Sequence, residues 1–255
     1  MTNRRRKEIA SLVHRKYRER LGQFCVEGVR SVEAAVAAGA PLVELVVGEA
    51  ARADDRVRAL LEQAGVPVHV LPDREVARLS DVQASQGVLA VARTVLVPET
   101  TLHTHRTVLV LDGLQDPGNV GTNLRTAAWF GVEAVLAGPG TADFFNPKAV
   151  RAAMGGLWDV RLARTADLPA ALERLRRAGF ALYGADLDGI EVHAWTPPFP
   201  SALVLGSEAH GLTPGVAACL DARVTVPGHT ARRGAESLNV AVAAGILMAQ
   251  WFKSS

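Results

Sequence analysis

The sequence predicts an α/β protein with a small α/β domain followed by a larger domain built on a parallel sheet. Apolar runs of strand length alternate with helical patterns from residue 23 to the C-terminus. In the second half these runs are continuously apolar, which is typical of a parallel sheet covered on both faces. A polar stretch without periodicity, "LVPETTLHTHR", separates the halves. We therefore expect a first domain over residues 1–95, a linker over 96–106 and a second domain over 107–255.

In the first half, apolar residues recur at helical spacing through the basic run, so we expect one amphipathic helix there. The residues at this spacing are Ile9, Leu12, Val13, Tyr17 and Leu21. Further along this half, the strands are expected at 23–28, 42–48, 66–71 and 87–94, and the helices at 31–39, 54–65 and 73–80. Glycines at positions 39 and 65 are helix-ending signals.

In the second half, six apolar runs predict strands, and the segments between them predict helices. The strands are expected at 107–114, 134–138, 159–164, 181–186, 201–208 and 222–228. The helices are expected at 119–130, 148–154, 168–179 and 215–221, with a closing helix from residue 237 onward. This order of elements predicts an open parallel sheet, in which ligands gather at the carboxyl ends of the strands.

Composition limits the function classes. The chain has 255 residues, with 49% hydrophobic and 21% charged, as in an ordinary soluble globular protein. The net charge of +2 excludes a general polycation, so any nucleic-acid contact must come from local patches. Two cysteines and no H-E-x-x-H pair predict no metal centre. With neither a secretory signal nor a membrane-spanning apolar run, we expect a cytoplasmic protein.

The basic run between residues 4 and 20, "RRRKEIASLVHRKYRER", is one local patch. It has two interpretations of equal weight: a surface that contacts nucleic acid, or a solvated helix face. The candidate contacts are Arg4, Arg5, Arg6, Lys16 and Arg18.

The first motif with chemical character is "DPGNVGTNLRTAAWFG", residues 116–131. It follows a strand and opens a helix, but it lacks the G-x-G-x-x-G of dinucleotide folds. Backbone N–H groups at a helix start attract anions, and the fork of Arg125 suits a phosphate or carboxylate. Asn119 and Asn123 flank the same helix start. The structural alternative is an Asn cap with a surface arginine.

The second motif, "LVLGSEAHGLTP", spans residues 203–214. Gly206 ends a buried strand and would let a ligand approach the backbone closely. Glu208 lies just past this strand, where a semi-buried carboxylate is often functional. The alternative is a turn followed by an acidic residue at a helix start.

The third motif, "VTVPGHTARRGAESLNVAVAAGILMAQ", spans residues 224–250. A basic glycine-containing loop leads to a helix that is apolar all round, which is typical of a buried helix. The polar first turn, with Ser237 and Asn239, is therefore expected to face something specific. The alternative for Ser237 is an ordinary N-cap.

Together, in this order, the three motifs resemble those of the SpoU/TrmH family of RNA ribose 2′-O-methyltransferases, within the SPOUT superfamily. The resemblance covers residues 108–252, and "FFNPKAVRAAMGG" at 144–156 is similar to the linking segment of the family. The opening "KYRERLGQFCVEGVRSVEAAVAAG" at 16–39 resembles the substrate-binding domain that many members carry, which is related to ribosomal RNA-binding proteins.

The resemblance implies the roles of individual residues. The implied catalytic residues are Asn119, Arg125, Glu208, Ser237 and Asn239. The implied cofactor is S-adenosylmethionine, and the residues that hold it are Leu205, Gly206, Val226, Pro227 and Leu238. The resemblance also implies a trefoil knot in the second domain and a homodimer that forms through this domain.

The implied reaction is methyl transfer to a ribose 2′-hydroxyl in structured RNA, with ribosomal RNA favoured over tRNA. A nucleotide-binding oxidoreductase and a non-catalytic RNA-binding protein are the other function classes. The missing G-x-G-x-x-G argues against the first, and the five intact polar residues argue against the second.

One departure from the family pattern concerns the loop between Val226 and Ser237, which is longer than is usual in the family. It contains Arg232 and Arg233. This loop is either an additional contact to RNA phosphates or a tolerated surface insertion.

Overall fold

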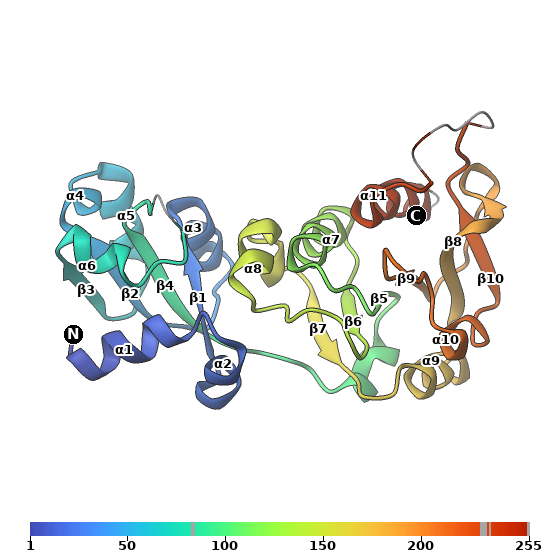
Figure 1. The fold of residues 1–255 in the computed structure, drawn as a ribbon, viewed down its shortest axis with the longest axis horizontal. Helices are drawn as coiled ribbons and strands as arrows, with labels where there is room; N and C mark the ends of the chain where they lie inside the picture. Colours follow the sequence, from blue (N-terminus) through green and yellow to red (C-terminus); the bar gives the residue numbers. More distant parts are fainter. Residues whose placement is uncertain (83–84, 230–233, 235, 254–255) are drawn as a thin grey trace. The chain divides into compact units, whose positions relative to one another are not determined.

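The computed structural model describes residues 1–82, 85–229, 234 and 236–253. The chain forms two compact units, which are described separately below. The first comprises residues 1–95 together with residues 143–158, and the second comprises 96–142 and 159–255. The α/β fold class is confirmed for both units (Figure 1).

The first unit contains a four-stranded mixed sheet in the order β1-β4-β2-β3. β4 runs antiparallel to both β1 and β2, and β2 runs parallel to β3. The strands are β1 (Gln23–Glu27), β2 (Leu42–Gly48), β3 (Val68–Leu71) and β4 (Val88–Arg93). The helices are α1 (Asn3–Ser11), α2 (Arg15–Leu21), α3 (Val29–Ala37), α4 (Glu49–Arg52), α5 (Asp55–Gln63) and α6 (Asp73–Ala77).

The single helix predicted over the basic run is wrong, because α1 and α2 are separate helices. Leu12 is buried with Ile9 in the core, whereas Val13 is exposed. Arg18 Nη1 donates to the carbonyl oxygens of Leu12 and Val13, at 2.8 Å each. These bonds satisfy carbonyls that a continuous helix would have used internally, so they stabilise the break.

Residues 143–158 belong to the first unit although in sequence they follow the first motif and lie between two segments of the second unit. They form α8 (Pro147–Ala153) and the 3₁₀ turn η2 (Gly156–Trp158). The rings of Phe145 and Trp158 lie 4.8 and 5.8 Å from the ring of Phe24, measured between centroids. The segment is therefore held by aromatic packing on β1.

The second unit contains a six-stranded parallel sheet in the order β10-β8-β9-β5-β6-β7. The parallel sheet was predicted, whereas the strand order comes from the structure alone. The strands are β5 (Thr107–Asp112), β6 (Ala134–Ala137), β7 (Arg161–Arg164), β8 (Ala181–Glu191), β9 (Ser201–Gly206) and β10 (Ala222–Thr225). Both faces of the central strands β5 and β9 are buried, which explains their continuous apolar sequences.

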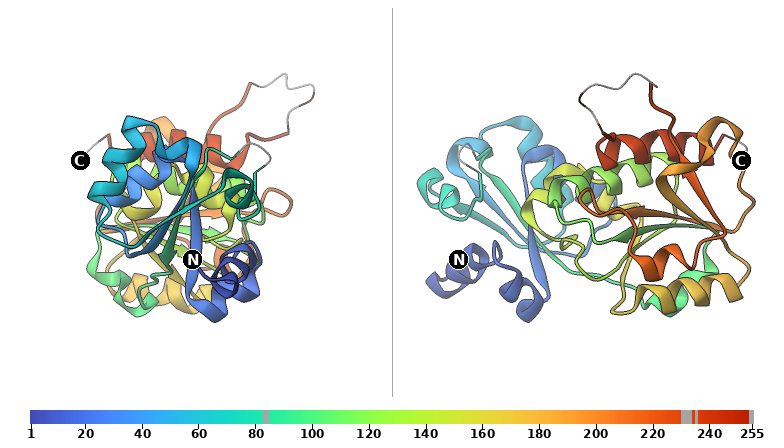
Figure 2. Two further views of the ribbon diagram at one scale, coloured as in Figure 1. Left: turned by 90° about the vertical axis from the view of Figure 1, so that its left-hand side faces the viewer. Right: turned by 45° about the vertical axis from the view of Figure 1, so that its right-hand side comes forward.

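Helices cover both faces of this sheet. On one face lie α7 (Pro117–Phe130) and α11 (Val240–Trp251), and on the other lie α9 (Leu168–Arg177) and α10 (Pro214–Ala217) (Figures 1 and 2). A further 3₁₀ turn, η3 (Val192–Ala194), precedes β9. Within the described parts of the chain, every helix is too short or too polar to span a lipid bilayer.

The segment that the sequence predicts as a linker, 96–106, is structured and lies in the second unit. It forms the 3₁₀ helix η1 (Glu99–Thr104), and Leu102 is buried in the core with residues of α9. A single buried leucine in a polar stretch produces no periodic pattern, so the sequence did not indicate that Leu102 packs in the core.

Candidate active site

The three motifs meet at the carboxyl edge of the second sheet. β5, β9 and β10 run in the same direction, so Asp112, Gly206 and Thr225 all end strands at this edge. α7 follows β5, a short loop follows β9, and the chain after β10 leads to α11. This edge is where a parallel sheet binds ligands.

One polar side chain from each motif enters a hydrogen-bonded network. Asn119 Nδ2 donates to Glu208 Oε1, and Asn239 Nδ2 donates to Asn119 Oδ1 at 3.2 Å. Asn119 lies 89 residues from Glu208 and 120 residues from Asn239 in sequence. The fold thus brings together three of the five implied catalytic residues.

The local sequence of α7 positions Asn119. Asp116 caps the helix by accepting from Gly118 N at 3.1 Å, and Pro117 occupies the first turn. Asn123 is fully buried and donates through Nδ2 to the carbonyl of Asn119 at 2.9 Å. Asn123 Oδ1 has no partner among the described residues. A buried polar side chain thus braces the backbone at the site.

The first turn of α11 positions Asn239, because Asn239 itself is the N-cap. Its Oδ1 accepts from Ala241 N at 2.9 Å and from Val242 N at 3.4 Å. The expectation that the closing helix starts at Ser237 is therefore wrong by three residues. Ser237 is exposed, and the structure does not bring it into the network formed by Asn119, Glu208 and Asn239. Asn takes the cap because its side chain reaches two free N–H groups.

Arg125 is exposed on α7, and its guanidinium has no ion pair or hydrogen bond with any other described residue. Trp129, one turn further along the helix, is 84% exposed. A cation without an intramolecular partner is free to bind an anion from outside the chain.

Gly206 was predicted to let a ligand approach the backbone, but in the structure it makes room for another part of the protein. A Cβ at this position would overlap the backbone of Gly211 and Leu212, so the close approach is made by the protein's own loop. Ser207 and Gly211 exchange two backbone hydrogen bonds, of 3.0 and 2.9 Å, which close this loop. The glycine therefore shapes the turn that carries Glu208.

Asp112 is a site residue that the sequence interpretation missed. It is buried at the end of β5, and its Oδ2 accepts from Thr213 N at 2.7 Å. This bond ties the loop after β9 to the neighbouring strand. The available signal was an acidic residue at the end of a buried strand, which is similar to the signal that identified Glu208 just past β9.

The implied cofactor-binding residues lie on the elements that meet at this edge. Leu205 and Gly206 are buried at the end of β9, Val226 is half-buried after β10, and Pro227 and Leu238 are exposed. None of the five has a charged side chain. Among the described residues, no group of three or more His, Cys, Asp or Glu side chains is arranged to hold a metal ion.

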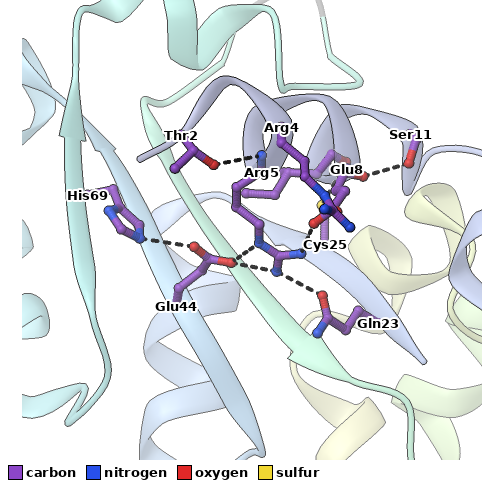
Figure 3. Close-up of polar contacts among 10 residues, drawn as sticks. Thr2, Arg4, Arg5, Glu8, Ser11, Gln23, Cys25, Glu44 and His69 are labelled. Atoms are coloured by element: carbon purple, nitrogen blue, oxygen red, sulfur yellow. Dashed lines mark hydrogen bonds and ion pairs between the residues drawn. The ribbon is translucent and has the colours of Figure 1, made fainter. Parts of the chain in front are cut away.

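The predicted RNA contacts in α1 are mostly engaged within the protein. Figure 3 shows Arg5 bound to the buried Glu44 through Nε at 2.5 Å, and to Glu8 and Gln23. Burial alone would lower the pKa of Arg5, but the bonds of Arg5 to Glu44 and Glu8 outweigh this effect and raise its pKa. His69 Nε2 lies 3.0 Å from the other carboxylate oxygen of Glu44. This cluster therefore holds α1 on the sheet.

The other predicted RNA contacts differ in accessibility. Arg6 pairs with Glu75, whereas Arg4 is exposed and pairs with Glu8 on its own helix. Lys16 is exposed. Arg232 and Arg233 lie outside the described residues.

Arg18 requires a correction. Its side chain is only 3% exposed, and Nε donates to Asp143 Oδ2 at 2.9 Å. A guanidinium bound on two sides and buried cannot reach RNA phosphates. The helical spacing placed Arg18 on the solvated face of one long helix, but the break before α2 turns it inward.

Comparison with known proteins agrees with this geometry. The profile of the SpoU rRNA methylase family matches residues 106–249, more than half of the chain. The protein belongs to this family. The profile of the MRM3-like substrate binding domain matches residues 3–90.

Individual relatives match along nearly the whole chain. The 23S rRNA (guanosine(2553)-2′-O)-methyltransferase RlmP of Bacillus subtilis is 34% identical, covering 96% of this chain and 95% of RlmP. A TrmH-family protein from Porphyromonas gingivalis is 37% identical, with a TM-score of 0.86, and the match covers 100% and 99% of the two chains. The SpoU methyltransferase AviRb from Streptomyces viridochromogenes, in complex with AdoMet, is 26% identical with a TM-score of 0.85, covering 99% and 98%.

Proposed function

We propose that this protein is an S-adenosylmethionine-dependent methyltransferase that methylates a ribose 2′-hydroxyl in structured RNA, with ribosomal RNA as its substrate. The observation that carries the proposal is the Asn119–Glu208–Asn239 network, in which three separate motifs of the family converge at the carboxyl edge of the sheet. RlmP, which is named for 2′-O-methylation of 23S rRNA, supports the same chemistry.

The residues at this edge fit the proposed cofactor. Val226 and Leu238 supply apolar surface, and the segments that carry Leu205, Val226 and Leu238 offer backbone donors and acceptors for an adenine. The structure of AviRb with AdoMet supports this assignment. S-adenosylmethionine, when bound, supplies a methyl group on a good sulfonium leaving group.

With such a leaving group, the protein must position the ribose and help its hydroxyl lose a proton. Arg125 keeps its proton at neutral pH, so it is a poor base. In this proposal its fork binds the ribose phosphate and electrostatically lowers the pKa of the 2′-hydroxyl. Glu208, held by Asn119, lies in the same network and orients the polar side chains of the site.

The first unit is proposed to bind the RNA, with residues 1–95 as the substrate-binding domain and 107–255 as the methyltransferase domain. The family match of residues 3–90 to a substrate-binding domain supports this division. Among the predicted RNA contacts in the basic run, Arg4 and Lys16 are exposed and therefore accessible to the RNA.

The second unit is proposed to form a homodimer through α7 and α11. α11 is apolar all round, and yet Val242 is 52% and Ile246 37% exposed. With Trp129 on the neighbouring α7, these side chains leave apolar surface on this pair of helices. Such surface on a folded unit is typical of a subunit interface.

Two further parts of the proposal rest on family membership. The C-terminal segment is proposed to pass through a loop and form a trefoil knot. The protein is proposed to act in the cytoplasm, where an rRNA-modifying enzyme meets its substrate.

The test is transfer of a labelled methyl group from S-adenosylmethionine to RNA purified from a strain lacking the gene. We expect incorporation into ribosomal RNA at a ribose 2′-oxygen, and a loss of roughly 10²-fold or more in Arg125→Ala. Arg177→Ala is the matched control, because Arg177 is an exposed arginine of the same unit that pairs with Glu173. Label found only in tRNA would contradict the rRNA assignment. Cofactor and RNA binding without transfer would indicate a non-catalytic RNA-binding protein.

A further inference from the structure

An aromatic ring flanked by cations lies on α2. Lys16 Nζ is 5.0 Å and Arg20 Cζ is 4.7 Å from the centroid of the Tyr17 ring. The ring of His14, the N-cap residue, lies 6.2 Å from Tyr17 with its plane tilted by 52°. His14, Lys16 and Arg20 are exposed, and Tyr17 is half-buried. These four residues form what is here called the Tyr17 platform.

The orientation of α2 is fixed by the residue after Tyr17. Arg18 is buried and bonded to Asp143 and to the carbonyls of Leu12 and Val13. Because adjacent residues on a helix face different directions, locking Arg18 inward keeps Tyr17 at the surface. The backbone of Tyr17 is therefore held in position before any ligand binds.

The cations of the platform are not used in folding. Neither Lys16 nor Arg20 forms an ion pair with another described residue, whereas the neighbouring Arg15 pairs with Glu19 at 2.7 Å. An exposed cation–π contact is weak, so either cation can leave the ring for a stronger anionic partner. The platform thus combines a half-buried aromatic ring with two positive charges that have no ion-pair partner among the described residues.

We infer that the Tyr17 platform binds an unpaired RNA nucleotide, with the base stacked on the Tyr17 ring and the flanking phosphates bound by Lys16 and Arg20. The base displaces one cation from the ring, and that cation moves to a phosphate. Bases inside a duplex are already stacked, so the matching RNA feature is a loop, bulge or single-stranded end. This inference rests on the proposed RNA substrate and identifies a part of the RNA that the first unit selects.

The test measures binding of the full-length protein to two RNA probes of equal length, a hairpin with an unpaired loop and a blunt duplex. Tyr17→Ala is expected to weaken hairpin binding about tenfold, and Tyr17→Phe less than about twofold, because the phenyl ring still stacks. Tyr17→Leu keeps apolar bulk without a π face and should behave like Tyr17→Ala. Duplex binding should stay nearly unchanged in all three variants.

The salt dependence of binding distinguishes the electrostatic contribution of Lys16 and Arg20 from the stacking contribution of the Tyr17 ring. Lys16→Ala and Arg20→Ala should each reduce the slope of log affinity against log salt by about one, whereas Tyr17→Ala should leave it unchanged. Arg58→Ala is the matched control, because Arg58 is an exposed arginine of the same unit bound to Asp55. Thermal unfolding of each variant shows that the platform changes do not act through folding.

Normal hairpin binding by a folded Tyr17→Ala variant would overturn the inference. Equal losses of hairpin and duplex binding would also overturn it, since they indicate a purely electrostatic surface. Binding of an acidic peptide that depends on Tyr17 and competes with the hairpin would overturn it as well. If the wild-type protein methylates RNA while Tyr17→Ala binds normally, only this inference fails. If the wild-type protein binds the hairpin through Tyr17 but transfers no methyl group, the proposed function fails instead.

Discussion

At the scale of residues, the site depends on short polar contacts between segments that are distant in sequence. The Asn119 side chain donates a hydrogen bond to Glu208 and accepts one from Asn239. Asn239 also caps α11, so one side chain fixes the helix start and the network together. An amide can do this because it carries both a donor and an acceptor group.

The carboxylate of Glu208 is expected to matter for catalysis rather than for stability. In Glu208→Ala, the Asn119 amide loses its acceptor and is held only by the bond from Asn239, so methyl transfer should fall by about 10²-fold. Glu208 is exposed, so the free energy of unfolding should change by less than about 0.5 kcal/mol. Single-turnover transfer and urea unfolding measure the two effects. Glu173→Ala is the control, and full activity in Glu208→Ala would show that the network is not required.

Cys25 is expected to be unreactive in the folded protein. Burial raises the pKa of its thiol from 9.0 to about 12, with a smaller contribution from Glu27. The reactive thiolate is therefore scarce at pH 8.5, and iodoacetamide should label Cys25 only after unfolding.

The same shift has a consequence for stability. Above pH 9 the unfolded thiol ionises while the folded thiol stays protonated, so this group makes stability fall as the pH rises from about 9 towards 12. Mass spectrometry after labelling tests the reactivity, and urea unfolding at several pH values above 8 tests the stability, with Cys25→Ala as the comparison in both. Rapid labelling of Cys25 in the native protein would contradict the burial.

At the scale of elements, α2 is a helix whose position is set by one ion pair. The pair between Arg18 and Asp143 joins α2 to residues 143–158, and Phe24 packs against two rings of the same segment. The break between α1 and α2 turns Arg18 inward and leaves the Tyr17 platform outward.

Removing one partner of this pair should be costly. Arg18→Ala leaves the mostly buried Asp143 without its cation, so we expect a loss of about 3–5 kcal/mol in the free energy of unfolding. Arg15→Ala breaks only the exposed pair with Glu19 and should cost less than about 1 kcal/mol. Urea unfolding of both variants tests this contrast, and equal values for the two would refute a structural role for Arg18.

At the scale of the whole molecule, the proposed function assigns RNA recognition to the first unit and methyl transfer to the second. The first unit carries the Tyr17 platform, and the second carries the network at the carboxyl edge of its sheet. The exposed apolar residues of α11, the helix that Asn239 caps, link the proposed dimer to the proposed reaction.

Charge placed on this apolar face is expected to separate the subunits. Val242→Glu should convert a dimer into a monomer and reduce methyl transfer, because burying an unpaired carboxylate in an interface is unfavourable. Leu187→Glu is the matched control, since Leu187 is 62% exposed on β8 and not on this face. Light scattering coupled to size exclusion measures the mass. A wild-type monomer with full activity would contradict the dimer proposal.

Much of the fold could be predicted because burial imposes a period on the sequence. The strands of the second sheet are buried on both faces, so β5 and β9 were visible as continuous apolar runs. The motifs around Asn119 and Glu208 were found because polar residues directly follow such strands. The break between α1 and α2 was not visible, since Ile9 and Leu12 keep helical spacing up to the point where the chain turns.

The sequence by itself determined the alternation of elements, the parallel sheet, the family and the residue types of the site, because these depend on local pattern and composition. Only the tertiary structure decided which neighbours each residue meets. It turned Arg18 into a buried partner of Asp143, gave the helix cap to Asn239 rather than Ser237, and filled the space beside Gly206 with the protein's own loop. These outcomes depend on contacts between distant segments, which form only when the whole chain packs.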